Sequence, residues 1–271
     1  MVLEILLNGI KMKVSIITPT FNSSNTIIDT INSINNQSYD KIEHIIIDGN
    51  STDQTLNLCK KYAPKSIIIS EKDSGIYDAM NKGLNMATGE IVGILNSDDF
   101  YINDELIEII VESFKADSDL KIIYGNLIYV STKDTSISIR EWMSKPYYER
   151  YFEDSNIPPH PTLFLRKEVY QLVGNFNLEY KLAADYEFMF RLFKLNNLKS
   201  LYINMFFVKM RVGGATSKNL NNILKQNIEI FRCWKNFGYN LPFSFFFKKI
   251  LNRTTQFFFK NNSNGNFIYR K

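Results

Sequence analysis

The chain has 271 residues, 45% of them hydrophobic and 22% charged, which is ordinary for a globular protein and enough for a sizeable core. Its two cysteines, Cys59 and Cys233, show no CxxC spacing, so the sequence predicts neither a disulfide framework nor a structural zinc site and fits a reducing compartment. The opening residues 1–14 lack a basic leader, and no apolar run approaches the roughly 18 residues of a membrane-spanning helix, so we expect neither a signal peptide nor an integral membrane protein.

Charge is divided unevenly along the chain. Residues 231–271 hold eight of the 32 basic residues and no Asp or Glu, so residues 1–230 keep 24 basic residues against 28 acidic ones, a net charge of −4. A mildly acidic body with a strongly basic tail suggests that the tail meets an anionic surface.

The first hundred residues alternate strand-like apolar runs with segments of helical spacing. Ser51 or Thr52 is expected to cap the second helix. The expected elements are strand 13–18, helix 24–35, strand 43–47, a helix ending at 62, strand 66–70, helix 76–86 and strand 91–95. This alternation predicts right-handed crossovers and an α/β fold, with a largely parallel sheet covered by helices on both faces.

Polar clusters follow four of these strands, at residues 20–22, 48–53, 71–73 and 96–99. Ligands of such sheets bind beyond the carboxyl ends of the strands. Carboxylates crowded at that edge repel one another unless a cation or a cationic ligand lies between them. The sequence therefore predicts a ligand site at this edge.

The second hundred residues alternate less regularly. The expected elements are helix 105–114, strand 121–129, an aromatic stretch of mixed charge at 142–154, a proline-rich loop at 157–161, strand 162–166, and helices 167–173 and 184–195. We expect this part to cover the site and receive a second substrate.

The sharpest acidic cluster is Asn96-Ser97-Asp98-Asp99. Paired carboxylates at a strand end suit Mg²⁺ or Mn²⁺, which bind one or two such groups and leave positions open for substrate phosphates. For an isolated Ser-Asp-Asp, a helix N-cap at Asp99 is the simpler alternative.

Eight motifs together resemble glycosyltransferase family two, which has the GT-A fold, in order and spacing over residues 13–217. They are PTFN at 19–22, IDGNSTDQT at 47–55, SEKDSGIYDAMNKG at 70–83, ATGE at 87–90, LNSDD at 95–99, HP at 160–161, ADYEF at 184–188 and VGGAT at 212–216. Within that family, the chain looks most like enzymes that assemble bacterial O-antigen, capsule or exopolysaccharide units.

The resemblance implies a nucleotide-sugar donor, and it favours uridine as the base. Asp48 would contact the base or ribose, and Asp73 would contact the base. The implied donor-binding residues are Pro19, Thr20, Asn22, Asp48, Asp73, Asn81, Asn96, Ser97 and Asp98.

Asn96-Ser97-Asp98 stands where the family has its Asp-x-Asp motif. Asp98 would contact a Mn²⁺ or Mg²⁺ ion that bridges the donor diphosphate. Asn96 replaces the first acid, so it is expected to bind ribose, with Asp99 helping to hold the metal.

Asp185 matches the catalytic base of the family, although Ala184 replaces the usual preceding acid. A carboxylate there can take the proton of the attacking hydroxyl, which gives inversion in one displacement. Without the other motifs, Asp185 could equally be a helix N-terminal residue favoured by the macrodipole. His160, Gly213, Gly214 and Thr216 are candidate acceptor or phosphate contacts; a structural histidine and a simple turn are the alternatives.

The tail shows an amphipathic helical pattern over residues 243–260. Its apolar stripe comprises Phe243, Phe246, Phe247, Ile250, Leu251, Thr254, Phe257 and Phe258, and its polar face comprises Lys248, Lys249, Asn252, Arg253, Gln256 and Lys260. An anionic membrane surface fits this pattern. Packing on the catalytic body or on a second subunit is the alternative.

The sequence thus predicts a GT-A catalytic domain at 1–217, with a nucleotide-sugar half (13–100) and an acceptor half (101–217), followed by a helical tail at 218–271. The expected activity is metal-dependent transfer of a hexosyl or N-acetylhexosaminyl group to a glycan or lipid-linked acceptor, on the cytoplasmic face of the membrane. The alternatives are a nucleotidyltransferase, which would need a glycine-rich basic phosphate loop, and a non-catalytic carbohydrate-binding protein. No nucleic-acid partner is expected.

Overall fold

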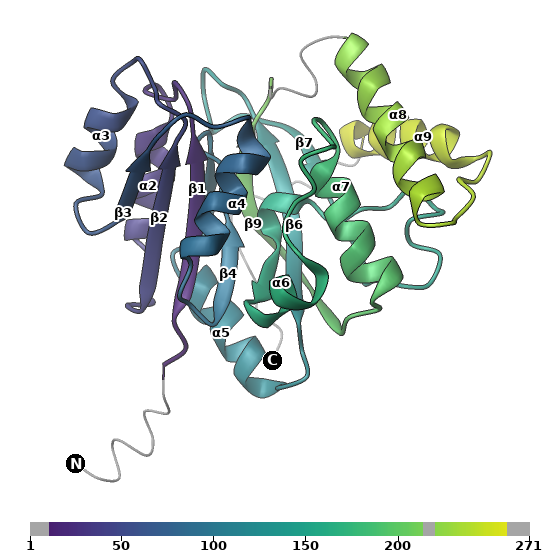
Figure 1. Cartoon of the computed structure of the whole chain (residues 1–271), viewed down its shortest axis with the longest axis horizontal. Coiled ribbons are helices and arrows are strands. Elements are labelled where there is room, and N and C mark those ends of the chain that lie inside the picture. The colour runs from purple at the N-terminus through teal and green to yellow at the C-terminus, as the bar shows by residue number, and fades with distance from the viewer. Residues whose placement is uncertain (1–10, 214–219, 259–271) are drawn as a thin grey trace.

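The computed structural model describes residues 11–213 and 220–258 (Figure 1). The strands are β1 (Val14–Thr20), β2 (Ile42–Asp48), β3 (Ile67–Ser70), β4 (Ile91–Ile94), β5 (Asp99–Tyr101), β6 (Ile122–Val130), β7 (Ser138–Trp142), β8 (Phe164–Arg166) and β9 (Ser200–Arg211). The helices are α2 (Ile27–Asn35), α3 (Thr55–Tyr62), α4 (Ile76–Met86), α5 (Leu106–Ala116), α6 (Glu168–Val173), α7 (Ala184–Met189), α8 (Leu220–Asn236) and α9 (Phe245–Phe258), with a 3₁₀ turn η1 (His160–Thr162) and a π-helical turn η2 (Phe190–Leu195).

These strands form one sheet in the order β3-β2-β1-β4-β8-β6-β9-β5, and β7 pairs with β6. The expected parallel pairing holds for β1 to β4. β8 is antiparallel to both β4 and β6. Two reversals restore the strand direction, so β6 and its parallel neighbour β9 end at the same edge as β1 to β4.

Helices cover both faces of the sheet, because successive residues of a buried strand point to opposite sides. Ile17 packs in a cluster with α4 and α7, whereas the adjacent Ile16 packs in another with α5. In Figure 1, α4, α6 and α7 lie in front of the sheet and α2 and α5 behind it. Each such buried side chain contributes on the order of 2 kcal/mol. The α/β architecture expected from the sequence, a largely parallel sheet with helices on both faces, is confirmed.

The expected cap of the second helix is wrong. Helix α3 begins at Thr55, so neither Ser51 nor Thr52 caps it. Asp99 lies in β5 and not at the start of α5, whose N-cap is Glu105. The cap alternative for Asp99 is therefore also excluded.

The tail packs on the body through one side of its helices. Phe245 of α9 is buried, with its ring centroid 6.1 Å from that of Trp234 and 6.5 Å from that of Tyr186. Glu229 of α8 accepts hydrogen bonds from three successive main-chain N–H groups at 181–183, just before α7. The tail thus supports the segment that carries Asp185. The expected domain boundary at 217/218 and the residue Lys260 lie outside the described residues.

A buried histidine makes the stability of this fold pH-dependent. His44 on β2 is hydrogen-bonded to Thr18 and Ser66, and burial lowers its pKa to about 3. In the unfolded chain this histidine binds a proton near pH 6.5, whereas in the folded protein it stays neutral down to about pH 3. The contribution of the neutral, buried His44 to the free energy of unfolding is therefore complete above pH 6.5 and is lost as the pH falls toward 3. We expect a loss of about 2 kcal/mol between pH 7 and pH 5. Denaturant unfolding at the two pH values measures it.

The matched variant is His44→Gln, which keeps a hydrogen-bonding group but does not titrate. It should flatten the pH dependence whatever its effect on stability at pH 7. Part of the slope should remain, because burial also lowers the pKa of His160. An unchanged slope in the variant would contradict the assignment.

Candidate active site

The predicted ligand edge is assembled by strand pairing. Thr20 lies opposite Asp48 in the β1–β2 register, and Asp48 lies opposite Ser70 in the β2–β3 register. The three strands therefore end together, as the sequence predicted. Thr20 is buried, and its hydroxyl oxygen has no hydrogen-bond partner among the described residues.

The loops after β1 and β2 are locked together by hydrogen bonds. Asn22 and Asn50 both have left-handed φ angles, of 49° and 64°, a region that asparagine tolerates better than most residues. Asn22 donates its main-chain N–H to the Ser51 hydroxyl and accepts a 2.9 Å bond from the Thr52 N–H. The Asn22 side chain, expected to bind the donor, thus positions the second loop.

Asp53 holds the same pair of loops. Although burial opposes its ionisation, hydrogen bonds from Thr55 and Ser24 lower the pKa of Asp53 to about 2. Asp53 is therefore a charged anchor between the loop after β1 and the start of α3.

Asp48 is fully buried beneath these loops. Its carboxylate accepts hydrogen bonds from the Ser51 hydroxyl and main chain and a 2.6 Å bond from the Ser70 hydroxyl. The next residue is Gly49, and because it has no side chain, Asp73 and Phe21 can approach its main chain closely. A Cβ at this position would lie 2.5 Å from the Asp73 carboxylate and 3.4 Å from the Phe21 ring. Phe21, which the sequence analysis did not single out, is 60% exposed. An exposed ring beside a carboxylate and a bare main chain can stack and hydrogen-bond a flat base.

The Asn96–Asp99 cluster is built between α2 and β9. Ser97 shares a 2.8 Å hydrogen bond with Ser23, and the Asn96 side-chain amide donates to Asp99 at 3.0 Å. Asp99 is fully buried, and burial together with the charge of Asp98 raises its pKa well above the usual value. Burial also raises the pKa of Asp98, which is only half buried.

Arg211, at the end of β9, fixes this cluster in place. Its guanidinium donates a 2.7 Å bond to the Asp98 main-chain oxygen and pairs with the Asp29 carboxylate. No spacing in the sequence marked this lone arginine. Asp98, Arg211 and Gly213 line a hollow of about 700 Å³. Gly213 has a left-handed φ of 102°, and the accompanying Gly214 and Thr216 lie outside the described residues.

The residues of this cluster fit a divalent cation. Two buried oxygens, Asn96 Oδ1 and Asp99 Oδ1, have no hydrogen-bond partner among the described residues. The charge of Asp98 also makes ionisation of Asp99 less favourable, which a cation would relieve. No group of three or more His, Cys, Asp or Glu suited to a metal occurs within residues 11–213 and 220–258. The protein would thus supply few ligands, and substrate phosphates and water would complete the shell.

Asp185 stands at the first turn of α7, half buried. Its Oδ1 accepts a 3.0 Å hydrogen bond from the Tyr77 hydroxyl. Burial and then the charge of Asp185 raise the Tyr77 pKa well above its usual value, so this hydroxyl stays a donor. His160 lies within reach of the Asp185 charge, but burial dominates and lowers its pKa. Tyr77 belongs to the 70–83 motif, although the sequence gave it no role.

Two of the candidate contact residues, Asn81 and His160, have partners within the protein. Both polar groups of the Asn81 amide bond the main chain of Phe176, each at 2.9 Å. The His160 ring packs edge-on against Phe176, with centroids 5.4 Å apart. Asn81 and His160 therefore shape the wall beside Asp185.

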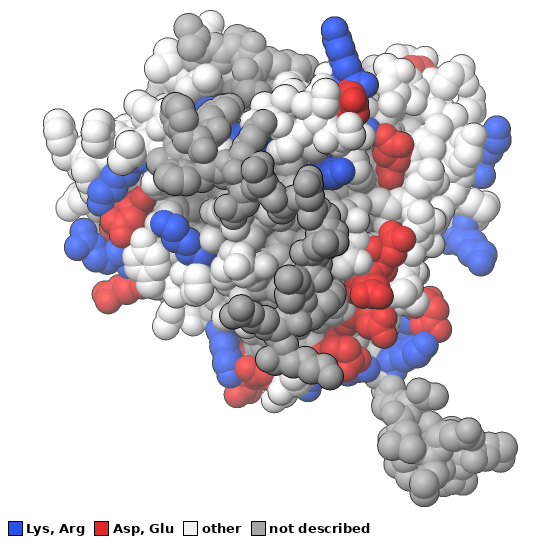
Figure 2. All heavy atoms as spheres, turned by 180° about the vertical axis from the view of Figure 1, so that it is seen from behind, with Lys and Arg blue, Asp and Glu red and all other residues white. Residues whose placement is uncertain are grey.

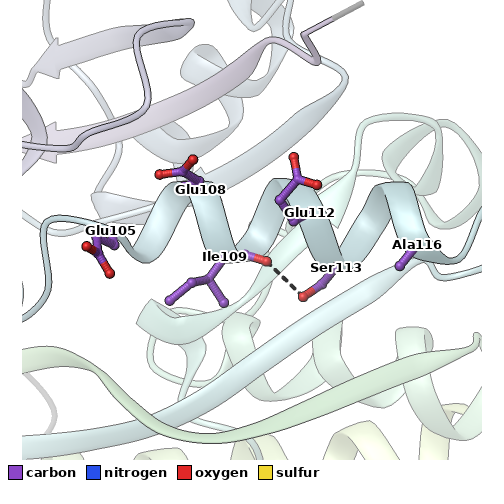
Figure 3. Close-up of a pocket in the computed structure, with 6 residues that line it drawn as sticks. All are labelled: Glu105, Glu108, Ile109, Glu112, Ser113 and Ala116. Carbon is purple, nitrogen blue, oxygen red and sulfur yellow. Dashed lines mark hydrogen bonds between the residues drawn. The ribbon is translucent and has the colours of Figure 1, made fainter. Parts of the chain in front are cut away.

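A second hollow, of about 470 Å³, lies on the outer face of α5, toward the other edge of the parallel strands (Figures 1 and 3). Its lining residues are Glu105, Glu108, Ile109, Glu112, Ser113 and Ala116. Three carboxylates on one helix would repel a nucleotide phosphate. On the rear of the molecule, most acidic side chains of the described residues gather in a band on the right-hand side of the view, and basic side chains lie at its margins and on the left (Figure 2).

Comparison with known proteins identifies the family of the chain. Residues 15–171 match the family model described as glycosyl transferase family 2. A PGL/p-HBAD biosynthesis glycosyltransferase of Mycobacterium tuberculosis is 29% identical over 210 residues, which cover 76% of this chain and 79% of that protein. The chondroitin synthase of Escherichia coli is 29% identical over 79% of this chain, but the match covers 31% of the synthase.

Two solved structures share the fold. S. aureus TarS 1-349 in complex with UDP-GlcNAc superposes with a TM-score of 0.62 and 22% identity, covering 91% of this chain and 73% of that one. Mannosyltransferase PcManGT from Pyrobaculum calidifontis, in complex with GDP-Man and Mn²⁺, has a TM-score of 0.61 and 19% identity, covering 90% and 69%.

The fold and the family match together define a GT-A glycosyltransferase. The family match covers more than half of the chain and favours this class over a nucleotidyltransferase. The chain belongs to glycosyltransferase family 2.

Proposed function

We propose that the enzyme moves a sugar from a uridine diphosphate donor to a hydroxyl of a glycan or lipid-linked acceptor, with inversion, in bacterial surface polysaccharide synthesis. One observation carries this proposal. The segment after β3 approaches the donor loops through Asp73 and, four residues later in the first turn of α4, bonds Asp185 through Tyr77. A donor held at Gly49 and Asp73 would thus have its sugar directed toward Asp185. TarS, whose structure contains UDP-GlcNAc, supports uridine as the base.

The donor-binding residues divide into two groups by role in this proposal. Pro19, Thr20, Asp48 and Asp73 bind the nucleoside end of the donor. Asn96 and Ser97 bind the ribose and the diphosphate. Residues 13–100 form the donor half and residues 101–217 the acceptor half.

The reaction is a single displacement. The acceptor oxygen forms its bond to the anomeric carbon as the bond from that carbon to the diphosphate breaks on the opposite face. Asp185 accepts the hydroxyl proton, and its bond from Tyr77 fixes the orientation of the carboxylate. Asp98, with Asp99 beneath it, would hold Mn²⁺ or Mg²⁺, which supplies Lewis-acid stabilisation of the leaving diphosphate.

Thermal shift with nucleotide sugars tests the donor. UDP-GlcNAc, UDP-glucose, UDP-galactose and GDP-mannose are each added with and without Mn²⁺. We expect one UDP-sugar to raise the melting temperature most, since a ligand present at about 100 times its Kd stabilises the folded protein by about 2.7 kcal/mol. This increase should appear only with metal. A larger shift with GDP-mannose than with every UDP-sugar would contradict the proposed base.

We also propose that helices α8 and α9 lie on the cytoplasmic face of the membrane. These helices and the connection between them expose large apolar side chains, namely Leu224, Ile228, Phe231, Phe243, Phe247, Ile250 and Leu251. The side chains of Phe257 and Phe258 lie outside the described part of the chain. None of the helices within the described ranges is long and apolar enough to cross a bilayer. An exposed apolar surface of this kind suits insertion into the interface.

The structure corrects one detail of the expected membrane contact. Lys248 and Lys249 were expected to meet lipid headgroups. Instead, Lys248 donates to Asp154 at 2.8 Å and Lys249 donates to Asn227 at 2.7 Å. Lys248 thus bonds the body and Lys249 bonds helix α8, so the apolar side of α9 is the one that would enter the lipid.

The double substitution Phe247→Ser with Ile250→Ser tests this surface. Both side chains are well exposed, at 71% and 65%, so the melting temperature should change little. Binding to vesicles containing an anionic lipid should fall at least about tenfold, because each large apolar side chain contributes about 2 kcal/mol on burial. Co-sedimentation measures the binding.

Phe245→Ser is the matched control, since Phe245 is buried and its loss should lower the melting temperature. Unchanged vesicle binding by the double variant would exclude the membrane surface. A change in oligomeric state instead would assign the exposed face to a second subunit.

A further inference from the structure

Helix α9 turns its cationic side toward the active site. Phe245 anchors its first turn against Tyr186, the residue that follows Asp185. Lys248 fixes one flank of the helix on Asp154. One residue on, the part-buried Lys249 bonds Asn227 of α8 and lies within range of the Asp185 charge.

Two arginines join Lys249 at the same opening. Arg140 of β7 lies over the Tyr129 ring, 3.9 Å from its centroid, near the end of β6. Arg253, one turn beyond Lys249 on α9, acts electrostatically on both Lys249 and Arg140. The Tyr129 hydroxyl in turn lies within range of Arg140, Arg253 and Asp99. The strand register supports this proximity, because Arg140 lies opposite Tyr129, Tyr129 opposite Met210, and Met210 opposite Asp99. Helix α9, which carries Lys249 and Arg253, contacts β7, which carries Arg140.

The proximity of these three cationic side chains is electrostatically unfavourable within the protein. Burial and then the charge of Arg253 lower the pKa of Lys249 to about 8. Burial and then the charge of Arg253 lower the pKa of Arg140 as well. Cations that repel one another beside a reaction centre are stabilised when an anion of high charge binds among them. Arginine forks and a lysine ammonium together suit phosphate oxygens.

We propose that Lys249, Arg253 and Arg140 form a binding site for a substrate phosphate beside Asp185. The site rests on the proposed function, because it shares its opening with the donor and the base. Its phosphate comes either from the donor diphosphate or from a phosphate carried by the acceptor. In both cases the tail helix supplies part of the active site.

Calorimetric titration of the full chain tests the site with two probes, UDP with Mn²⁺ and inorganic pyrophosphate added to protein already saturated with UDP. The variants are Lys249→Met, which keeps the side-chain stem, Arg253→Gln at an exposed position, and the two combined. Lys248→Met is the matched control, because it removes a neighbouring charge of the same helix that is bonded to Asp154.

We expect the double variant to bind at least one probe at least tenfold more weakly, and Lys248→Met to stay within twofold of the unaltered protein. Weaker UDP binding assigns the site to the donor diphosphate. Weaker pyrophosphate binding with unchanged UDP binding assigns it to the acceptor phosphate. If Lys249→Met lowers the melting temperature, the site is judged from Arg253→Gln alone, because the Arg253 side chain is exposed.

Affinities within twofold for both probes in the double variant would overturn the phosphate site and leave the proposed function intact. Failure of the unaltered protein to bind UDP would contradict the proposed donor. Pyrophosphate binding that depends on Lys249 would still support the phosphate site in that case.

Discussion

Asp185→Asn should lower the turnover number by at least about 100-fold while donor binding stays nearly unchanged. A positioned general base contributes about 100-fold to 10,000-fold, and an amide at the same place cannot accept the proton. The amide oxygen can still accept the hydrogen bond that Tyr77 now gives to Oδ1. The substitution therefore removes the basicity and keeps the position.

Tyr77→Phe separates orientation from basicity. It removes the hydroxyl that holds Asp185 but leaves the carboxylate. The loss of turnover should be smaller than in Asp185→Asn, and the Tyr77 ring should still stack on Phe176, whose centroid is 5.7 Å away. Asp119→Asn, at an exposed position beyond α5, is the control for removal of one carboxylate.

Steady-state kinetics and calorimetry decide the role of Asp185. Turnover should fall in Asp185→Asn with the UDP affinity within about twofold of the unaltered protein. A large loss of UDP affinity would instead place Asp185 in the donor site. Turnover within tenfold of the unaltered enzyme would exclude it as the base.

The donor half could be predicted from the sequence because its signals are local. Apolar runs set β1, β2, β3 and β4, and polar residues follow directly where each strand ends. The strand order and the register then bring Thr20, Asp48 and Ser70 together. Parallel pairing of neighbouring βα units fixes that arrangement with few alternatives.

The second half depends on contacts between distant residues. Strands β5, β7 and β9 were not foreseen as separate elements, and β9 carries Arg211, whose partners Asp29 and Asp98 lie more than a hundred residues away. Helical spacing identified the amphipathic character of α9, but not which side would face the body. The Lys248–Asp154 pair and the buried Phe245 decide the orientation, and both depend on tertiary structure.

Asp98→Asn should reduce transfer at least about 1,000-fold, equivalent to about 4 kcal/mol of transition-state stabilisation, and should abolish the effect of Mn²⁺ on donor binding. The side chain faces the hollow, whereas the contact with Arg211 uses the Asp98 main-chain oxygen. Asparagine keeps the size and that contact. Only the charge available to a cation is lost.

The same substitution should not lower stability, and this distinguishes a ligand from a structural residue. Burial raises the pKa of Asp98, and the charge of Asp98 adds to the raised pKa of Asp99, so the ionised pair is unfavourable in the folded protein. A neutral amide removes that repulsion at pH 7. We therefore expect the metal-free variant to melt at the same temperature as the unaltered protein or a few degrees higher, although it is inactive.

Asp104→Asn, exposed just before α5, is the control and should change neither the activity nor the melting temperature. Full activity of the unaltered enzyme in EDTA, or activity of Asp98→Asn within tenfold of it, would refute the metal role of Asp98. A large fall in melting temperature would make Asp98 a structural residue.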